Sequence, residues 1–250
     1  MPLRGPGGNT GESFQDSHRM SVVGHLAEAR RRIIQSLLAL CAAFAACYFF
    51  QDAIFSLLLI HAKELQLITV RPTELFMEGL ATAFFSGLFL ASPVILYQLC
   101  AFLWPGLKDN ERRWVLRGLL GGAGLFLLGM AFAYYAVIPV ALRFLVGLSI
   151  SGVRPMYTLS NYMSFVWTFL VLFGLAFQVP IVMAFLAGIG LLSPESLRAK
   201  RKYCILIIFI ISAIITPPDV VSQVLMAAPL IVLYEAGILG AGAVRRLRRR

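Results

Sequence analysis

Long runs of apolar residues, nearly free of charge, constrain the fold of this chain more than any other feature of its sequence. A helix that crosses the hydrocarbon core of a bilayer needs about 20 such residues. Of the 250 residues 59% are hydrophobic and 14% are charged, whereas an ordinary soluble domain is about 25% charged. The sequence therefore predicts an all-α integral membrane protein.

The apolar runs predict six transmembrane helices, of which the last two form a short hairpin. The spans are expected at about residues 33–50, 75–103, 119–138, 162–189, 203–216 and 220–240. Pro139 is expected to end the third span, and Pro180 to kink the fourth, because proline lacks the N–H that a helix needs. The turn between the last two spans is expected at Thr216, Pro217, Pro218 and Asp219, and the arm before it is only about 20 Å long.

The segments around these spans are polar or amphipathic. Residues 1–20 predict a disordered cytoplasmic lead, residues 21–244 the membrane domain, and residues 245–250 a basic cytoplasmic tail. Residues 51–73 predict an amphipathic helix on the outer surface, with a plain loop as the alternative. The first span follows three arginines, as in a cleaved signal peptide, but its length favours a helix that stays in the protein.

Basic residues orient the predicted spans, because cytoplasmic loops of membrane proteins are rich in lysine and arginine. Dense clusters occur at residues 30–32, 108–117, 198–202 and 245–250, whereas the intervening loops hold only Lys63, Arg71, Arg143 and Arg154. Six spans place every dense cluster on one side. Both termini are therefore predicted to be cytoplasmic, and the net charge of +10 indicates membrane topology and not nucleic-acid binding.

The sequence offers no recognisable catalytic, metal or cofactor site. Its histidines, His18, His25 and His61, lie outside the predicted spans, and it contains no phosphate-binding loop and no zinc-binding helix motif. The four cysteines have no metal-ligand or redox spacing. The chain is thus not expected to be an enzyme or to hydrolyse ATP, so any driving force comes from the membrane potential, a proton gradient or a partner.

Scarce polar residues are the remaining candidates for function. Within the spans they are Gln98, Gln178, Thr216, Gln223 and Glu235, and such side chains tend to face a bundle interior or another helix. Near the cytoplasmic side, Glu28 and Glu111 each lie beside arginines. From local sequence alone, a helix-end ion pair is the favoured interpretation of both acids, and a binding site is the alternative.

Several motifs occur in one order along the chain and resemble the TatC subunit of the twin-arginine protein translocase. They are HLAEAR at 25–30, PVILYQ at 93–98, AFLWPGL at 101–107, ERR at 111–113, FGLAFQVP at 173–180, TPPD at 216–219 followed by Ser222 and Gln223, and Pro229 with LYE at 233–235. Together they cover most of the chain, in register with the six predicted spans.

This resemblance implies a glove-like bundle of six helices in the bacterial inner membrane that binds twin-arginine signal peptides of folded proteins at its cytoplasmic face. It assigns signal-peptide binding to Glu28 and Glu111. A carboxylate can hold a guanidinium through two hydrogen bonds, so two adjacent arginines match two acids. Export would then be driven by the proton-motive force without ATP.

The resemblance also implies partners: single-span TatA-type and TatB-type subunits that meet the last two helices near the polar residues Thr216 and Gln223, and further copies of the chain itself. One position departs from the family, because Gln178 stands where a glutamate is usual. Glutamine keeps its hydrogen-bonding groups but cannot carry a proton. A small-molecule secondary transporter is the main alternative, although the sequence shows no repeated half; an intramembrane enzyme ranks below it.

Overall fold

The structure, a computed structural model, describes the backbone of residues 22–63, 65–103, 109–147, 156–215 and 220–248. Within these ranges it leaves out the side chains of residues 22–23, 103, 109–120, 221–222 and 247–248. Apart from one pair of two-residue strands, the regular structure in this part of the chain is helical. The long helices are α1 (Val22–Phe49), α3 (Glu74–Leu103), α4 (Asp109–Phe132), α6 (Leu159–Ala176), α9 (Arg201–Ile215) and α10 (Val220–Arg248).

Five helical segments are long and apolar enough to cross a membrane. They are Gly24–Phe49, Glu74–Phe102, Gly121–Gly147, Leu159–Gly188 and Gln223–Arg246. Helix α9, at 15 residues, is shorter, and at 1.5 Å per residue it measures about 22 Å. It precedes residues 216–219, the predicted hairpin turn, which lie outside the described residues.

Of two prolines in the long segments, Pro139 departs from the sequence-based expectation and Pro180 follows it. The third long segment continues past Pro139, because a π-helical stretch at Ala133–Val137 precedes it and Pro139 becomes the second residue of α5 (Ile138–Gly147). Proline has no N–H to donate, and here it follows a stretch in which the regular α-helical hydrogen-bond pattern is already interrupted. The fourth segment breaks before Pro180, at residues 177–178, and restarts as α7 (Val179–Gly188).

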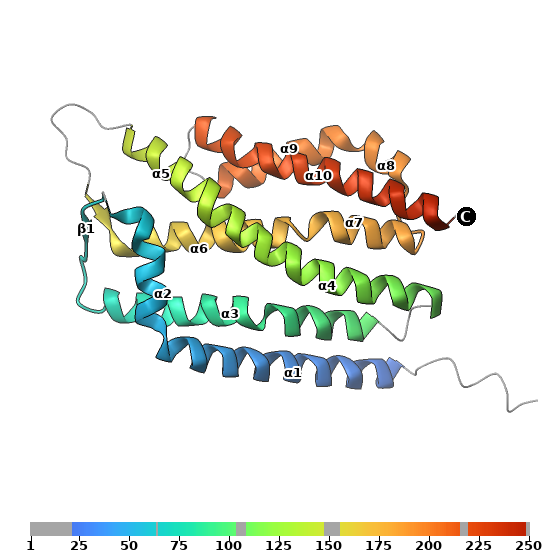
Figure 1. The fold of residues 1–250 in the computed structure, drawn as a ribbon, viewed down its shortest axis with the longest axis horizontal. Coiled ribbons are helices and arrows are strands. Elements are labelled where there is room, and N and C mark those ends of the chain that lie inside the picture. Colours follow the sequence, from blue (N-terminus) through green and yellow to red (C-terminus); the bar gives the residue numbers. More distant parts are fainter. Residues whose placement is uncertain (1–21, 64, 104–108, 148–155, 216–219, 249–250) are drawn as a thin grey trace, which may run out of the picture.

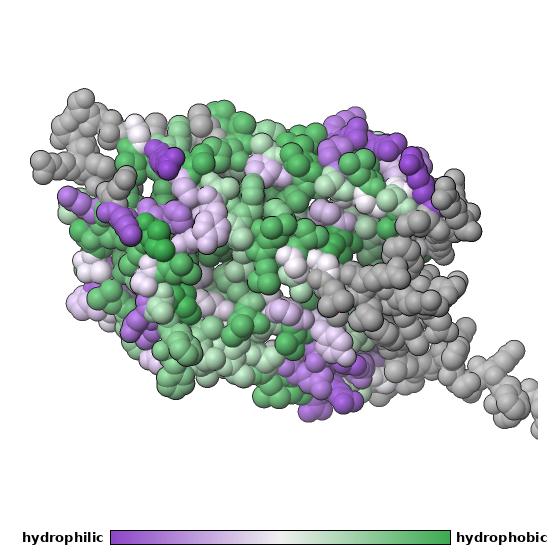
Figure 2. Space-filling view, in the orientation of Figure 1, coloured by the Kyte–Doolittle hydropathy of each residue, from purple (hydrophilic) through white to green (hydrophobic). Residues whose placement is uncertain are grey.

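The long helices run side by side, with α4 crossing in front of α6 and α7 (Figure 1). Helix α6 contributes more residues to the main apolar core than any other described helix, among them Met163, Trp167 and Phe173. The Trp167 indole stacks on the Phe85 ring of α3 with 5.2 Å between ring centroids. Figure 2 shows apolar residues across the middle of one face and hydrophilic residues toward its two ends, as expected for a chain in a bilayer.

Glycines allow two pairs of helices to approach closely. A Cβ atom added to Gly87 of α3 would lie 2.8 Å from the backbone of Phe44 in α1. At Gly129 of α4 it would lie 2.5 Å from the carbonyl oxygen of Phe173 in α6. Any larger side chain would therefore push the backbones apart, which fits the use of small residues at helix contacts in membranes.

The bundle has two unlike ends. At one end α1 begins, α3 finishes, α4 begins and α10 finishes, together with α8 (Pro194–Ala199) (Figure 1). The described dense basic clusters, at residues 30–32, 198–202 and 245–246, belong to these helix ends, so we call this the basic end. At the opposite end, β1 (Leu67–Ile68) pairs in parallel with β2 (Tyr157–Thr158), and we call this the strand end.

Helix α2 (Gln51–Leu58) and a 3₁₀ turn (Leu59–Ala62) lie at the strand end, within the segment for which the sequence predicts an amphipathic surface helix. Two tyrosines hold this segment to the bundle. The Tyr134 hydroxyl donates to the Leu57 carbonyl at 2.6 Å, and the Tyr162 hydroxyl donates to the Leu58 carbonyl at 2.7 Å. These bonds supply partners for two carbonyls near the end of α2, where helices leave carbonyls unpaired.

Candidate functional site

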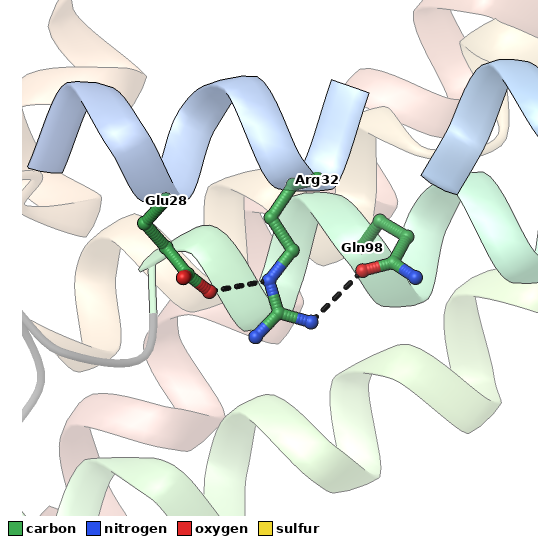
Figure 3. A network of polar contacts seen from close by, with 3 residues as sticks. All are labelled: Glu28, Arg32 and Gln98. Atoms are coloured by element: carbon green, nitrogen blue, oxygen red, sulfur yellow. Dashed lines mark hydrogen bonds and ion pairs between the residues drawn. The ribbon is translucent and has the colours of Figure 1, made fainter. Parts of the chain in front are cut away.

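Glu28 lies on α1 at the basic end and contacts an arginine of its own helix. The Arg32 Nε atom donates to Glu28 Oε1 at 2.6 Å, one turn along α1 (Figure 3). The Glu28 side chain is 20% exposed and the Arg32 side chain is 26% exposed. The pair is therefore open to solvent but partly screened from it, so the local ion pair that the sequence allows does form.

Arg32 also reaches across to α3. Its Nη1 atom donates to Gln98 Oε1 at 2.9 Å, and Gln98 is buried (Figure 3). A second contact joins the same helices, because the His25 ring stacks on the Phe102 ring at 4.5 Å between centroids. Positions 25, 28 and 32 share one face of a helix, so the HLAEAR motif lines the face of α1 that contacts α3.

Glu111 lies in the first turn of α4, and its side chain is outside the described residues. The backbone of α4 begins at the basic end, the same end as Glu28 (Figure 1). Joint binding by the two acids stays a prediction.

Gln178 lies at the break between α6 and α7. Its Nε2 atom donates to the backbone carbonyl of Gly122 in α4 at 2.8 Å. The amide therefore makes a contact inside the chain, between the fourth long segment and α4. A protonated carboxyl could donate in the same way, but an ionised one could not.

Gln223 lies in the first turns of α10 and packs toward α9. Its Nε2 atom donates to the Phe209 carbonyl at 3.1 Å, so it links the two helices of the predicted terminal hairpin. Thr216, Pro217, Pro218 and Asp219, the other residues of the predicted hairpin turn and polar patch, lie outside the described residues.

Two buried acids at the strand end were not singled out from the sequence. Glu74 Oε2 accepts from the N–H groups of Val70 at 2.7 Å and Arg71 at 3.3 Å, and its Oε1 accepts from the Ser160 N–H at 2.9 Å. Glu78 Oε1 accepts from the Ser160 hydroxyl at 2.6 Å. The available signal was their spacing of four residues at the start of an apolar span, where unpaired carboxylates are costly. These acids tie α3 to the start of α6.

The described residues contain no group of three or more histidine, cysteine or acidic side chains arranged to hold a metal ion. The four cysteines, Cys41, Cys47, Cys100 and Cys204, are free thiols.

Comparison with known proteins decides the family. The family model described as Sec-independent protein translocase protein (TatC) matches residues 24–229. The chain belongs to the TatC family. A TatC relative from Aquifex aeolicus is 42% identical over 234 residues, which cover 91% of this chain and 97% of the relative. A TatC relative from Carboxydothermus hydrogenoformans is 40% identical over 229 residues, with 90% and 94% covered.

The fold agrees with a solved TatC structure. A crystal structure titled as the twin arginine translocase receptor TatC superimposes with a TM-score of 0.78 at 41% identity, covering 88% of this chain and 99% of that one. As a TatC protein, the chain is a core subunit of the Sec-independent protein translocase and not an enzyme. The motif at residues 25–30 and Gln178 both lie within the matched range.

Proposed function

We propose that this TatC protein binds the paired arginines of a signal peptide at its basic end, with Glu28 and Glu111 each accepting one guanidinium. The observation that supports Glu28 most directly is that its carboxylate already holds the guanidinium of Arg32 at 2.6 Å. The carboxylate is thus already placed to accept hydrogen bonds from an arginine side chain. The TatC family match supports the same role.

The proposal is tested by peptide binding in detergent. Glu28→Gln and Glu111→Gln should each weaken binding of a twin-arginine signal peptide by about tenfold to a hundredfold, since a hydrogen bond to a charged group contributes about 1.5–3 kcal/mol. Both variants should also lose most of the preference for arginine over lysine, because lysine lacks the planar fork.

Glu195→Gln is the matched control, because it removes the same charge at the basic end from a side chain that is 71% exposed. A general attraction of basic peptides to acidic surfaces would respond equally to all three substitutions and would fade with salt. Binding of both peptides to Glu28→Gln and Glu111→Gln at wild-type strength would contradict the proposal.

We infer further that the basic end faces the cytoplasm and that six helices cross the inner membrane in a glove-like bundle, with α9 and α10 as the final hairpin. The concentration of arginine and lysine at one end supports this orientation. In a chain whose natural cysteines have been replaced, Lys200→Cys should react with an impermeant thiol reagent only from the cytoplasmic side. Lys63→Cys should react only from outside, and the reverse pattern would overturn the orientation.

The same reasoning favours single-span subunits of the TatA and TatB types as partners of the terminal hairpin, with further copies of the chain in a larger complex and transport driven by the proton-motive force. Helix α9 is short and exposes large apolar side chains, among them Leu206, Ile210 and Ile214. A helix that is too short for the bilayer gains by packing against another helix. Site-specific crosslinking from Ile210 to a single-span subunit tests this arrangement, and its absence in an assembled complex would contradict it.

A further inference from the structure

The guanidinium of Arg32 is held at two points by groups of different kinds. Its Nε atom donates to the charged Glu28 carboxylate at 2.6 Å, and its Nη1 atom donates to the neutral Gln98 amide oxygen at 2.9 Å (Figure 3). The neighbouring Arg31 is exposed and makes no polar contact with any described side chain. Among the contacts of the described side chains, Arg32 and not Arg31 is therefore coupled to Glu28.

A carboxylate that already holds a guanidinium is not an open site for any cation. An incoming cation must take over the contact with Glu28 or share the carboxylate with Arg32, against the repulsion of a second positive charge. A lysine ammonium is a compact point charge and offers no more than the contact it replaces. An arginine offers two parallel N–H donors to both carboxylate oxygens, and so forms a stronger contact than the single bond from Nε.

We propose that Arg32 is a specificity-determining residue that occupies Glu28 in the absence of a peptide, so that only a ligand able to displace a guanidinium binds there. Gln98 gives the displaced side chain a place to remain, because its bond to Nη1 does not involve Glu28. This inference rests on the proposed role of Glu28 in signal-peptide binding. It adds a selective element that the carboxylates alone do not supply.

The inference is tested by measuring the dissociation constants of a twin-arginine peptide and its twin-lysine variant for three proteins: the wild type, Arg32→Gln and Arg31→Gln. Arg32→Gln should bind the twin-lysine peptide about three- to tenfold more tightly and the twin-arginine peptide about twofold more tightly, given the strength of a partly exposed charge-assisted contact. The preference for arginine falls as a result. Arg31→Gln removes the same charge and should change both affinities equally.

Gln98 supplies a second measurement. Gln98→Leu should weaken twin-arginine binding about two- to fivefold when Arg32 is present, because the displaced guanidinium loses a hydrogen-bond acceptor. The same substitution in the Arg32→Gln background should have no effect. Such a cycle isolates the coupling of the two residues from any general loss of structure.

Weaker binding of both peptides by Arg32→Gln, or an unchanged preference for arginine, would overturn the inference and leave Arg32 as an ordinary link between α1 and α3. Glu28→Gln, measured in the same assay, separates this failure from failure of the proposed function. If Glu28→Gln loses binding while Arg32→Gln keeps the wild-type preference, only the inference about Arg32 fails. If Glu28→Gln binds like the wild type, the proposed role of Glu28 fails as well.

Discussion

The two ends of the bundle are held together by different kinds of polar contact. At the basic end three of the contacts are ion pairs between partly exposed side chains: Glu28 with Arg32, Arg201 with Glu235, and Arg245 with Glu195. Two hydrogen bonds accompany them, from Arg32 to Gln98 and from the Tyr234 hydroxyl to the Leu197 carbonyl. At the strand end they are hydrogen bonds from tyrosine hydroxyls to backbone carbonyls, and from backbone and serine groups to buried glutamates.

Side chains in exposed ion pairs can exchange one contact for another, whereas groups in buried hydrogen bonds cannot do so without a large loss of stability. An exposed ion pair costs little to open, since water or a ligand replaces each contact. A buried carbonyl that loses its donor keeps the full cost of desolvation. The strand end therefore fixes the relative positions of the helices, and the basic end keeps charged groups available for binding.

The largest effect on stability is expected at the strand end. Tyr162→Phe removes the donor to the Leu58 carbonyl from a side chain that is buried, and should lower the free energy of unfolding in detergent by about 1–3 kcal/mol. Tyr135→Phe is the control, because Tyr135 is exposed. Equal losses for the two variants would remove the contrast between the ends.

A smaller effect is expected midway along the bundle. Gln178→Met keeps the length of the side chain but removes the donor to the Gly122 carbonyl, and should cost about 0.5–1.5 kcal/mol of unfolding free energy. Leu175→Met, at an exposed position nearby, should be neutral. If Gln178→Met is as stable as the wild type, Gln178 contributes only van der Waals packing, and its hydrogen bond does not stabilise the contact between the helices.

At the basic end, breaking an ion pair should change stability less. Glu235→Gln weakens the 2.7 Å contact with Arg201, in which both side chains are about half exposed, and should cost less than about 1 kcal/mol. The loss should shrink further as salt is added. Unfolding measured at low and high ionic strength checks this, and a loss as large as that of Tyr162→Phe would contradict the comparison.

The smallest effect is a pH dependence at Glu195. Its own backbone N–H and the contact with Arg245 hold the pKa of this carboxyl below its ordinary value. A group of this kind adds stability above its unfolded pKa, about 4.3, and the contribution is lost as pH falls through the lower folded value. The unfolding temperatures of the wild type and Glu195→Gln should therefore differ slightly at pH 6 and converge in acid. A difference that widened in acid would contradict this.

Much of the helical framework was predictable because apolar runs and basic clusters carry that information directly. Helix α3 occupies Glu74–Leu103, beside the predicted 75–103. The continuation of the third helical segment past Pro139 was not predictable. It depends on the π-helical stretch before it, which is set by packing against α6 and has no signature in the local sequence. The pairing of β1 with β2 joins residues 90 apart, a contact that no local pattern specifies.

The candidate site was predictable in its residue types and less so in its contacts. The sequence indicated Glu28 and the possibility of a local ion pair, and Arg32 forms that pair. The bond from Arg32 to Gln98 was missed, because it depends on how α1 and α3 face each other. Glu74 and Glu78 were missed because their partner, Ser160, lies more than 80 residues away in the chain.

The π-helical stretch at Ala133–Val137 determines which side chains of the following helix, α5, face the core. An α-helix turns about 100° per residue, so one residue more or fewer rotates the remaining side chains by that angle. Deleting one residue here would restore a regular helix and turn Ile138 and Ala141, now buried, away from the core. An insertion or deletion in this stretch would therefore disturb the packing of the whole following helix, whereas a substitution would act only at its own position.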